Sequence, residues 1–229
     1  MVAVEGMNER LNKLRAAVLG ANDGIVSTAA VVVGVAGATP NVPAIATAGI
    51  AALIGGAVSM ALGEYVSVSS QRDMENAFIE RELELHKEDP HEEFEHLVAG
   101  YVASGLSAKT ALRVAKERTA EDPIKAHLEM HYGIDEDDLA NPWSAAIASF
   151  ISFFLGALLP LAAVLLPPDS WRVASTFIVT LAALAATGAV SARIGGASVT
   201  RAVLRLVIGG ALGLAITFGA GWVFGTTAL

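Results

Sequence analysis

The stretch AAVLGANDGIVSTAAVVVGVAGAT, residues 16–39, decides the fold of this chain. As a helix it would reach ~36 Å, which is enough to cross the ~30 Å hydrocarbon core of a bilayer. Asp23 is its only ionisable side chain, and a carboxylate at that depth costs at least ~2.5–3.5 kcal/mol on insertion. The stretch therefore predicts a membrane helix in which Asp23 is functional, because a cation, a proton or a water-filled path must offset that cost. The alternatives are a carboxylate at headgroup level and one that is simply kept protonated.

Four more apolar stretches are long enough to span a bilayer. They are residues 43–66, 143–166, 171–192 and 202–226. We therefore predict an all-α membrane protein with five transmembrane helices. The first stretch is too long for a signal-peptide core and no small-residue cleavage site follows it, so we interpret it as a retained anchor.

Charge is concentrated in the segment between the second and third spans. Residues 71–140 hold 18 of the 23 acidic residues, 8 of the 15 Lys and Arg, and all five His. An acidic insert argues against nucleic acid as a partner and favours cations. The absence of Cys excludes disulfides and thiolate metal sites. The predicted domains are a cytoplasmic segment 1–15, transmembrane helices at 16–66, a cytoplasmic acidic and His-rich helical metal-binding domain at 67–142, and transmembrane helices at 143–229.

Basic residues of the short loops predict the orientation. They flank the first span and the connection between the fourth and fifth spans, at Arg10, Lys13, Arg15, Arg193, Arg201 and Arg205. Both groups of basic residues lie on the cytoplasmic side if the N-terminus and the insert are in the cytoplasm and the C-terminus is outside. Within the insert, the second span is expected to continue as a helix. Further helices are expected to start at Asp89-Pro90, Ser107 and Asp122-Pro123, and the last to end at Gly133.

Polar residues of the second span form a candidate cation site with Asp23. Met60 and Glu64 are four residues apart, so they share a helix face, and Ser59 adds a hydroxyl nearby. Carboxylate with thioether suits borderline first-row ions such as Fe²⁺ or Mn²⁺ better than Mg²⁺ or Ca²⁺. The plainer alternatives are an interfacial carboxylate for Glu64 and core packing for Met60.

Histidines and acids of the insert recur at helical spacing. Glu82 and His86, Glu92 and His96, and His127 and His131 are each four apart, and paired helices can combine such ligands around one ion. Any single pair is more typical of a solvated acidic helix, but the clustering of every His with these acids favours metal binding in the insert. The segment HLEMH at 127–131 lacks the zinc-protease order, in which Glu directly follows the first His. We therefore expect no enzyme and no prosthetic cofactor.

The motifs GANDGIVST (20–28) and SMALGEYVSVSSQRD (59–73) resemble the vacuolar iron transporter family, including its plant nodulin-like branch. The resemblance covers nearly the whole chain. It implies a dimeric exchanger of Fe²⁺, and often Mn²⁺, for protons, which moves metal out of the cytoplasm. Asp23, Met60 and Glu64 match the family's intramembrane pathway positions.

The resemblance also implies ligands in the insert, with departures from the family pattern. Glu82 and Glu93 fall on ligand positions. His96 and His131 stand where the family often has Glu, and His127 stands at a Met-like position. Leu85 replaces another Glu, and Ala16 occupies a position that is acidic in some members. The ligand set that we predict is Glu82, His86, Glu93, His96, His127 and His131.

The sequence thus predicts a divalent-metal transporter with protons as counter-ions. Its expected partners are Fe²⁺ or a similar ion, the lipid membrane and a second copy of the chain. We expect a multi-pass protein of a bacterial inner membrane, with an organelle membrane as the alternative. Gly20/Gly24, Gly209/Gly213 and Gly221/Gly225 are spaced for close helix contacts, within the chain or between copies. The alternative function is a membrane-anchored metal-binding or sensing protein that transports nothing. A membrane metalloenzyme ranks last, because no general base has the required spacing.

Overall fold

The computed structural model describes residues 7–135 and 139–227, and these are helical without a β-strand. Five helices are long and apolar enough to cross a membrane. They lie in α1 (Met7–Ala38), α2 (Val42–Glu88), α6 (Pro142–Leu165), α7 (Arg172–Ile194, preceded by the 3₁₀ turn η3, Asp169–Trp171) and α8 (Val199–Thr227). This confirms the prediction of an all-α, multi-pass membrane protein.

The chain divides into two compact units, which we describe separately. The membrane unit comprises Asn12–Tyr65 and Pro142–Leu229, and the polar unit comprises Met1–Leu11 and Val66–Asn141. Helix α2 contributes to both. The cytoplasmic location of the polar unit and the domain limits given above stay predictions.

Two helices extend beyond the apolar stretches that identified them. Helix α1 begins at Met7, nine residues before the predicted span, because the polar segment ahead of Ala16 consists largely of good helix formers. Helix α2 continues without a break to Glu88, as predicted. Asn41 marks its start, since its side-chain oxygen accepts a hydrogen bond from the Ala44 N–H at 3.0 Å.

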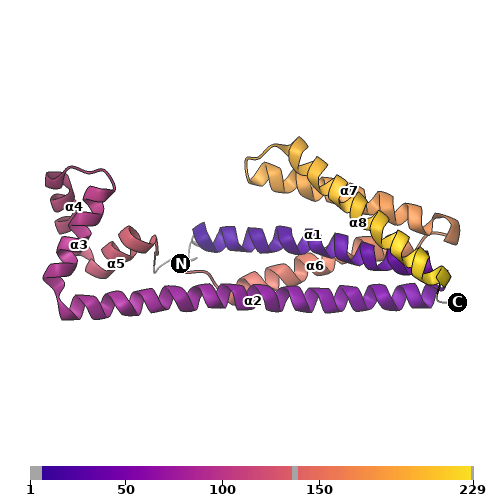
Figure 1. Cartoon of the computed structure of the whole chain (residues 1–229), viewed down its shortest axis with the longest axis horizontal. Coiled ribbons are helices and arrows are strands. Elements are labelled where there is room, and N and C mark those ends of the chain that lie inside the picture. Colours follow the sequence, from indigo (N-terminus) through magenta and orange to yellow (C-terminus); the bar gives the residue numbers. More distant parts are fainter. Residues whose placement is uncertain (1–6, 136–138, 228–229) are drawn as a thin grey trace, which may run out of the picture. The chain divides into compact units, whose positions relative to one another are not determined.

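The helix boundaries of the polar unit agree with the predicted caps (Figure 1). Its remaining elements are α3 (Pro90–Ala103), α4 (Ala108–Glu121), α5 (Pro123–His127) and the π-helix η1 (Leu128–Tyr132). Asp89 accepts hydrogen bonds from the backbone N–H groups at the start of α3, which lower the pKa of its carboxyl. Ser107 and Asp122 cap α4 and α5 in the same way. Gly133, with φ +65°, ends η1 in the left-handed region that favours glycine.

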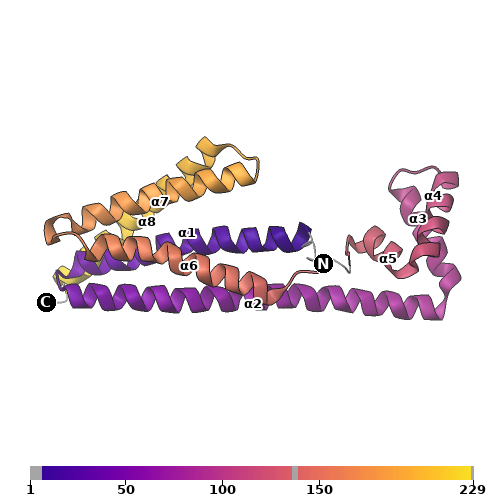
Figure 2. The same cartoon turned by 180° about the vertical axis from the view of Figure 1, so that it is seen from behind.

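The membrane unit has two apolar clusters that fix α1 between its neighbours. One joins α1, α2 and α6 and consists of Val32, Ile45, Leu53, Ala57, Phe153, Ala157, Leu161 and Val164. The other joins α1 and α8 through Ala29, Val33 and Leu214. Figures 1 and 2 show α1 beside the first half of α2, and α7 beside α8.

Glycines allow α1 to approach both α6 and α8 closely. A Cβ at Gly20 would lie 2.6 Å from the Ser149 carbonyl oxygen, and one at Gly24 would overlap the Phe153 backbone. Gly221 and Gly225 meet α1 in the same manner. Two of the three predicted glycine pairs therefore serve contacts inside the chain. Gly209 and Gly213 face open space within the part of the chain that the structure describes.

Replacement of Gly24 should weaken the α1–α6 contact. Gly24→Ala places a methyl group against the Phe153 backbone, which cannot yield as a side-chain tip can, and we expect a loss of at least about 2 kcal/mol of stability. Gly55→Ala is the matched control, because its methyl group meets no described atom within 4 Å. Thermal unfolding of both variants in detergent tests this, and equal stability would contradict the packing described.

Candidate metal sites

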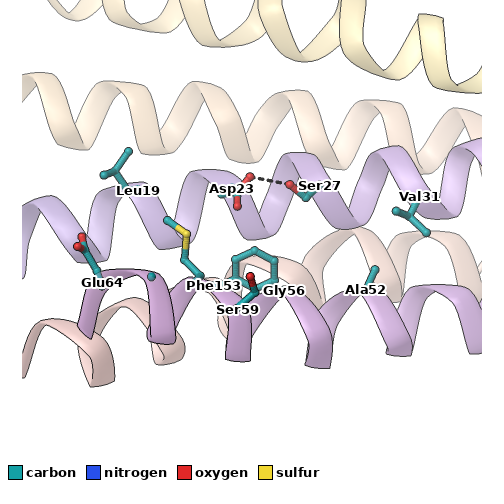
Figure 3. A pocket seen from close by; sticks show the side chains of 11 residues that line it. Leu19, Asp23, Ser27, Val31, Ala52, Gly56, Ser59, Glu64 and Phe153 are labelled. Carbon is teal, nitrogen blue, oxygen red and sulfur yellow. Dashed lines mark hydrogen bonds between the residues drawn. The ribbon is translucent and has the colours of Figure 1, made fainter. Parts of the chain in front are cut away.

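A pocket of about 500 Å³ lies in the membrane unit between α1 and α2 (Figure 3). Helix α1 contributes side chains at four-residue intervals, so that one continuous helix face lines the pocket. The lining residues are Leu19, Asp23, Ser27, Val31, Ala52, Gly56, Ser59, Met60, Gly63, Glu64 and Phe153. Asp23, Met60 and Glu64, which the sequence analysis selected, thus line the same pocket. Their role in transport stays a prediction.

Asp23 is held by a neighbour on its own helix. The Ser27 hydroxyl donates a hydrogen bond of 2.6 Å to Asp23 Oδ1, a short distance typical of a charged acceptor. This bond fixes one carboxylate oxygen and orients the side chain toward the pocket (Figure 3). Ser27 is not among the site residues predicted from the sequence, although its spacing of four residues from Asp23 was an available signal.

Glu64 lies at one end of the pocket lining and is only 9% exposed. Its Oε2 atom is 3.5 Å from a guanidinium nitrogen of Arg15. Met60, one turn earlier in α2, is partly buried against the apolar cluster of α1, α2 and α6. The pocket therefore offers two carboxylates, two serine hydroxyls and a thioether, a mixed donor set that suits a borderline divalent ion.

A second candidate site lies in the polar unit, where α2, α3 and α5 converge. Ligand atoms of Glu82, His86 and Glu93 all lie within 4.8 Å of one another, a separation that one metal ion can bridge. His127 adds a fourth group, because its Nδ1 is 3.4 Å from Glu82 Oε2 and 3.5 Å from Glu93 Oε2. Residues from three helices thus form one carboxylate–imidazole cluster.

Three members of this cluster are buried. Glu82, Glu93 and His127 are 3%, 6% and 1% exposed. Glu82 Oε2 and both ring nitrogens of His127 are enclosed without a hydrogen bond of good geometry. Such groups cost free energy unless another partner satisfies them. A bound cation is a partner that would satisfy carboxylate and imidazole together.

His96 and His131 lie at the more exposed edge of the same cluster. His96 Nδ1 is 3.4 Å from Glu93 Oε1, and the rings of His127 and His131 are 5.3 Å apart. Both line a pocket of about 490 Å³, together with Glu82, Glu93 and Tyr132. The structure therefore brings all six predicted insert residues together. His91, in contrast, pairs with Glu95 on an exposed surface.

The π-helix η1 gives His127 and His131 different environments. The spacing of four predicted a shared helix face, but α5 ends at His127 and the wider π turn follows. His127 is consequently buried and His131 exposed. The sequence offered no signal for a π turn. Tyr132, at its end, stacks on Phe78 with ring centroids 4.5 Å apart.

Burial adjusts the protonation of two groups in this cluster. It lowers the pKa of His127 to about 4, and repulsion from the rings of His86 and His131 acts in the same direction. Burial also raises the pKa of Tyr132, and the Glu82 carboxylate adds to that effect. At neutral pH the cluster therefore presents a neutral imidazole, which can bind metal through a free lone pair, beside a neutral phenol.

Comparisons with known proteins agree on one family. The profile of the VIT family matches residues 14–222. The chain is 40% identical to "Vacuolar iron transporter" of Acanthamoeba castellanii, over 92% of this chain and 78% of that protein. It is 35% identical to "Vacuolar iron transporter homolog 2.1" of Arabidopsis thaliana, over 96% and 85% of the two chains. It is 37% identical to "Vacuolar iron transporter homolog 1" of Oryza sativa subsp. japonica, over 94% of this chain and 75% of that protein.

The pKa of His127 predicts an acid-sensitive metal-free protein. Because the folded-state pKa lies below the unfolded value of about 6.5, the unfolded chain binds more protons, and stability falls as the pH drops toward 4. Between pH 7 and pH 5 this group should remove about 2 kcal/mol of unfolding free energy. His127→Gln should abolish that part of the pH dependence in denaturant titrations with a chelator present.

His91→Gln is the control, because His91 is exposed and should leave the pH dependence unchanged. Parallel pH curves for wild type and His127→Gln would contradict the prediction. They would show that the pKa of His127 is the same in the folded and unfolded states, so that burial does not lower it.

Proposed function

This chain belongs to the VIT family, and from that premise we propose that it exports Fe²⁺, with Mn²⁺ as a second substrate, from the cytoplasm in exchange for protons. The relatives are vacuolar iron transporters, or homologs of them, by name, which supports iron as the substrate here. The exchange with protons follows from chemistry, because a carboxylate that releases a metal ion can accept a proton in its place.

The observation that carries the proposal is the pocket between α1 and α2. It places Asp23 and Glu64, both acidic, among apolar helices long enough to cross a membrane. Charged groups at such depth are costly unless a counter-ion visits them. Met60 supplies a soft ligand, which favours Fe²⁺ and Mn²⁺ over Ca²⁺ and Mg²⁺. In this proposal the three side chains bind the ion during its passage.

The carboxylate–imidazole cluster is proposed to collect metal before transport. Buried Glu82, Glu93 and His127 are its centre, with His86, His96 and His131 around them. Carboxylates attract the cation, and neutral imidazoles select first-row transition ions over Ca²⁺ and Mg²⁺. The resemblance implies that His96, His127 and His131 stand at Glu-like and Met-like positions, where they would add nitrogen ligands to the proposed site.

The proposal extends to orientation and assembly. We place the N-terminus and the polar unit in the cytoplasm, which the basic residues around the short loops support. We further propose a homodimer in a bacterial inner membrane. The open face of α8 at Gly209 and Gly213 is compatible with a contact between copies.

Loss of the Asp23 carboxylate should stop transport. We expect Asp23→Asn to reduce Fe²⁺ uptake into proteoliposomes by at least about 100-fold, because the amide keeps the shape but neither binds the cation well nor carries the proton. Glu117→Gln is the control, since it removes an exposed carboxylate of α4 outside both sites. Gel filtration should show both variants folded.

The same assay separates the two candidate functions. Uptake of Fe²⁺ by the wild type, with accompanying movement of protons in the opposite direction, supports the transporter. Binding of Fe²⁺ without uptake would favour a membrane-anchored metal-binding or sensing protein. Unchanged uptake in Asp23→Asn would eliminate Asp23 as a carrier of the ion.

Metal binding by the polar unit is tested separately in the Asp23→Asn background, which weakens the membrane pocket's contribution. There we expect His127→Gln to weaken Co²⁺ binding at least about tenfold and to alter the visible spectrum of bound Co²⁺, because a nitrogen ligand is lost. His91→Gln should change neither. Identical affinities and spectra with and without the His127→Gln substitution would remove His127 from the ligand set.

A further inference from the structure

Arg15 continues the helix face that lines the membrane pocket. Arg15, Leu19 and Asp23 follow one another at intervals of four residues in α1, and the latter two line the pocket. Side chains with this spacing project from one side of a helix. The guanidinium of Arg15 reaches Glu64 of α2, with 3.5 Å between its terminal nitrogen and Glu64 Oε2. Arg15 therefore extends this face beyond Leu19 and engages one of the two pocket carboxylates.

The two partners of this ion pair differ in burial. The Glu64 side chain is 9% exposed and that of Arg15 is 51% exposed. A buried carboxylate is strongly destabilising without a compensating charge, whereas a half-exposed guanidinium on a long side chain can turn into water. Glu64 therefore depends on a cation, but Arg15 does not depend on Glu64.

The geometry of the pair is loose. A charge-assisted hydrogen bond between guanidinium and carboxylate is usually ~2.7–2.9 Å long, which is shorter than the 3.5 Å observed. A pair of this length is held mainly by charge, so another cation can replace the guanidinium. A divalent ion bound to Glu64 would also repel the guanidinium, since Arg keeps its positive charge in proteins.

We propose that Arg15 is a tethered cation that neutralises Glu64 while the pocket holds no metal, and that an arriving metal ion must displace it. This inference rests on the proposed transport function. Arg15 is in this account a positioning residue, because it acts on the ion through Glu64. It holds the carboxylate in place for the next ion, and it assists release by competing for the same oxygen.

The competition predicts a change in KM rather than in folding. Without the tethered competitor, metal binds Glu64 more readily, so Arg15→Gln should lower the KM for Fe²⁺ in proteoliposomes about threefold to tenfold, with no rise in maximal rate. Arg15→Lys, which restores the charge, should return KM toward the wild-type value. Arg10→Gln removes a positive charge from the same helix away from the pocket lining and should leave KM unchanged.

A double variant ties the effect to Glu64. In the Glu64→Gln background there is no carboxylate to compete for, so adding Arg15→Gln should not lower KM further. If Arg15→Gln does not yield folded protein, Arg15→Met retains the apolar stem and serves for the same measurement. An unchanged or raised KM in Arg15→Gln and Arg15→Met, or a lowered KM in Arg10→Gln as well, would overturn the proposal. Absence of Fe²⁺ uptake by the wild type would instead refute the transport function itself.

Discussion

The placement of acidic side chains among apolar helices is the constraint on which this structure depends. Asp23 and Glu64 lie on facing surfaces of α1 and α2, and a carboxylate inside a membrane is expensive unless something compensates its charge. The protein compensates in part with its own groups, because Ser27 donates to Asp23 and Arg15 faces Glu64. Close packing of α1 on α6 and α8, which its glycine contacts permit, holds these groups in register.

The two candidate sites both place carboxylates among buried or apolar surroundings, but they combine them with different second ligands. In the membrane pocket, carboxylates stand beside a thioether and hydroxyls, ligands that exchange readily with protons or water. In the polar unit, carboxylates stand beside neutral imidazole, and Glu82 Oε2 and both ring nitrogens of His127 lie buried without a good hydrogen bond. The first arrangement suits an ion in transit, and the second suits an ion that is selected and held. This division of labour is what the proposed transport cycle requires.

Features set by short-range physics could be predicted from the sequence. The spans follow from length and hydropathy, and the cap at Asp89 acts on N–H groups within three residues. The structure also gathers the predicted Asp23, Met60 and Glu64 at one pocket, because helical spacing places side chains on faces. The π turn that follows His127 and the ion pair between Arg15 and Glu64 were not predictable. No local sequence signal marks the π turn, and the ion pair joins residues 49 positions apart in the sequence.

The most direct test of the central claim is a crystal structure of the Fe²⁺-soaked protein with data collected at the iron absorption edge. The account predicts an anomalous peak in the membrane pocket within coordination distance of Asp23 and Glu64, in addition to one at the Glu82–Glu93–His127 cluster. An iron peak at the cluster alone, with Asp23 and Glu64 bonded only to protein groups in fully loaded crystals, would contradict it.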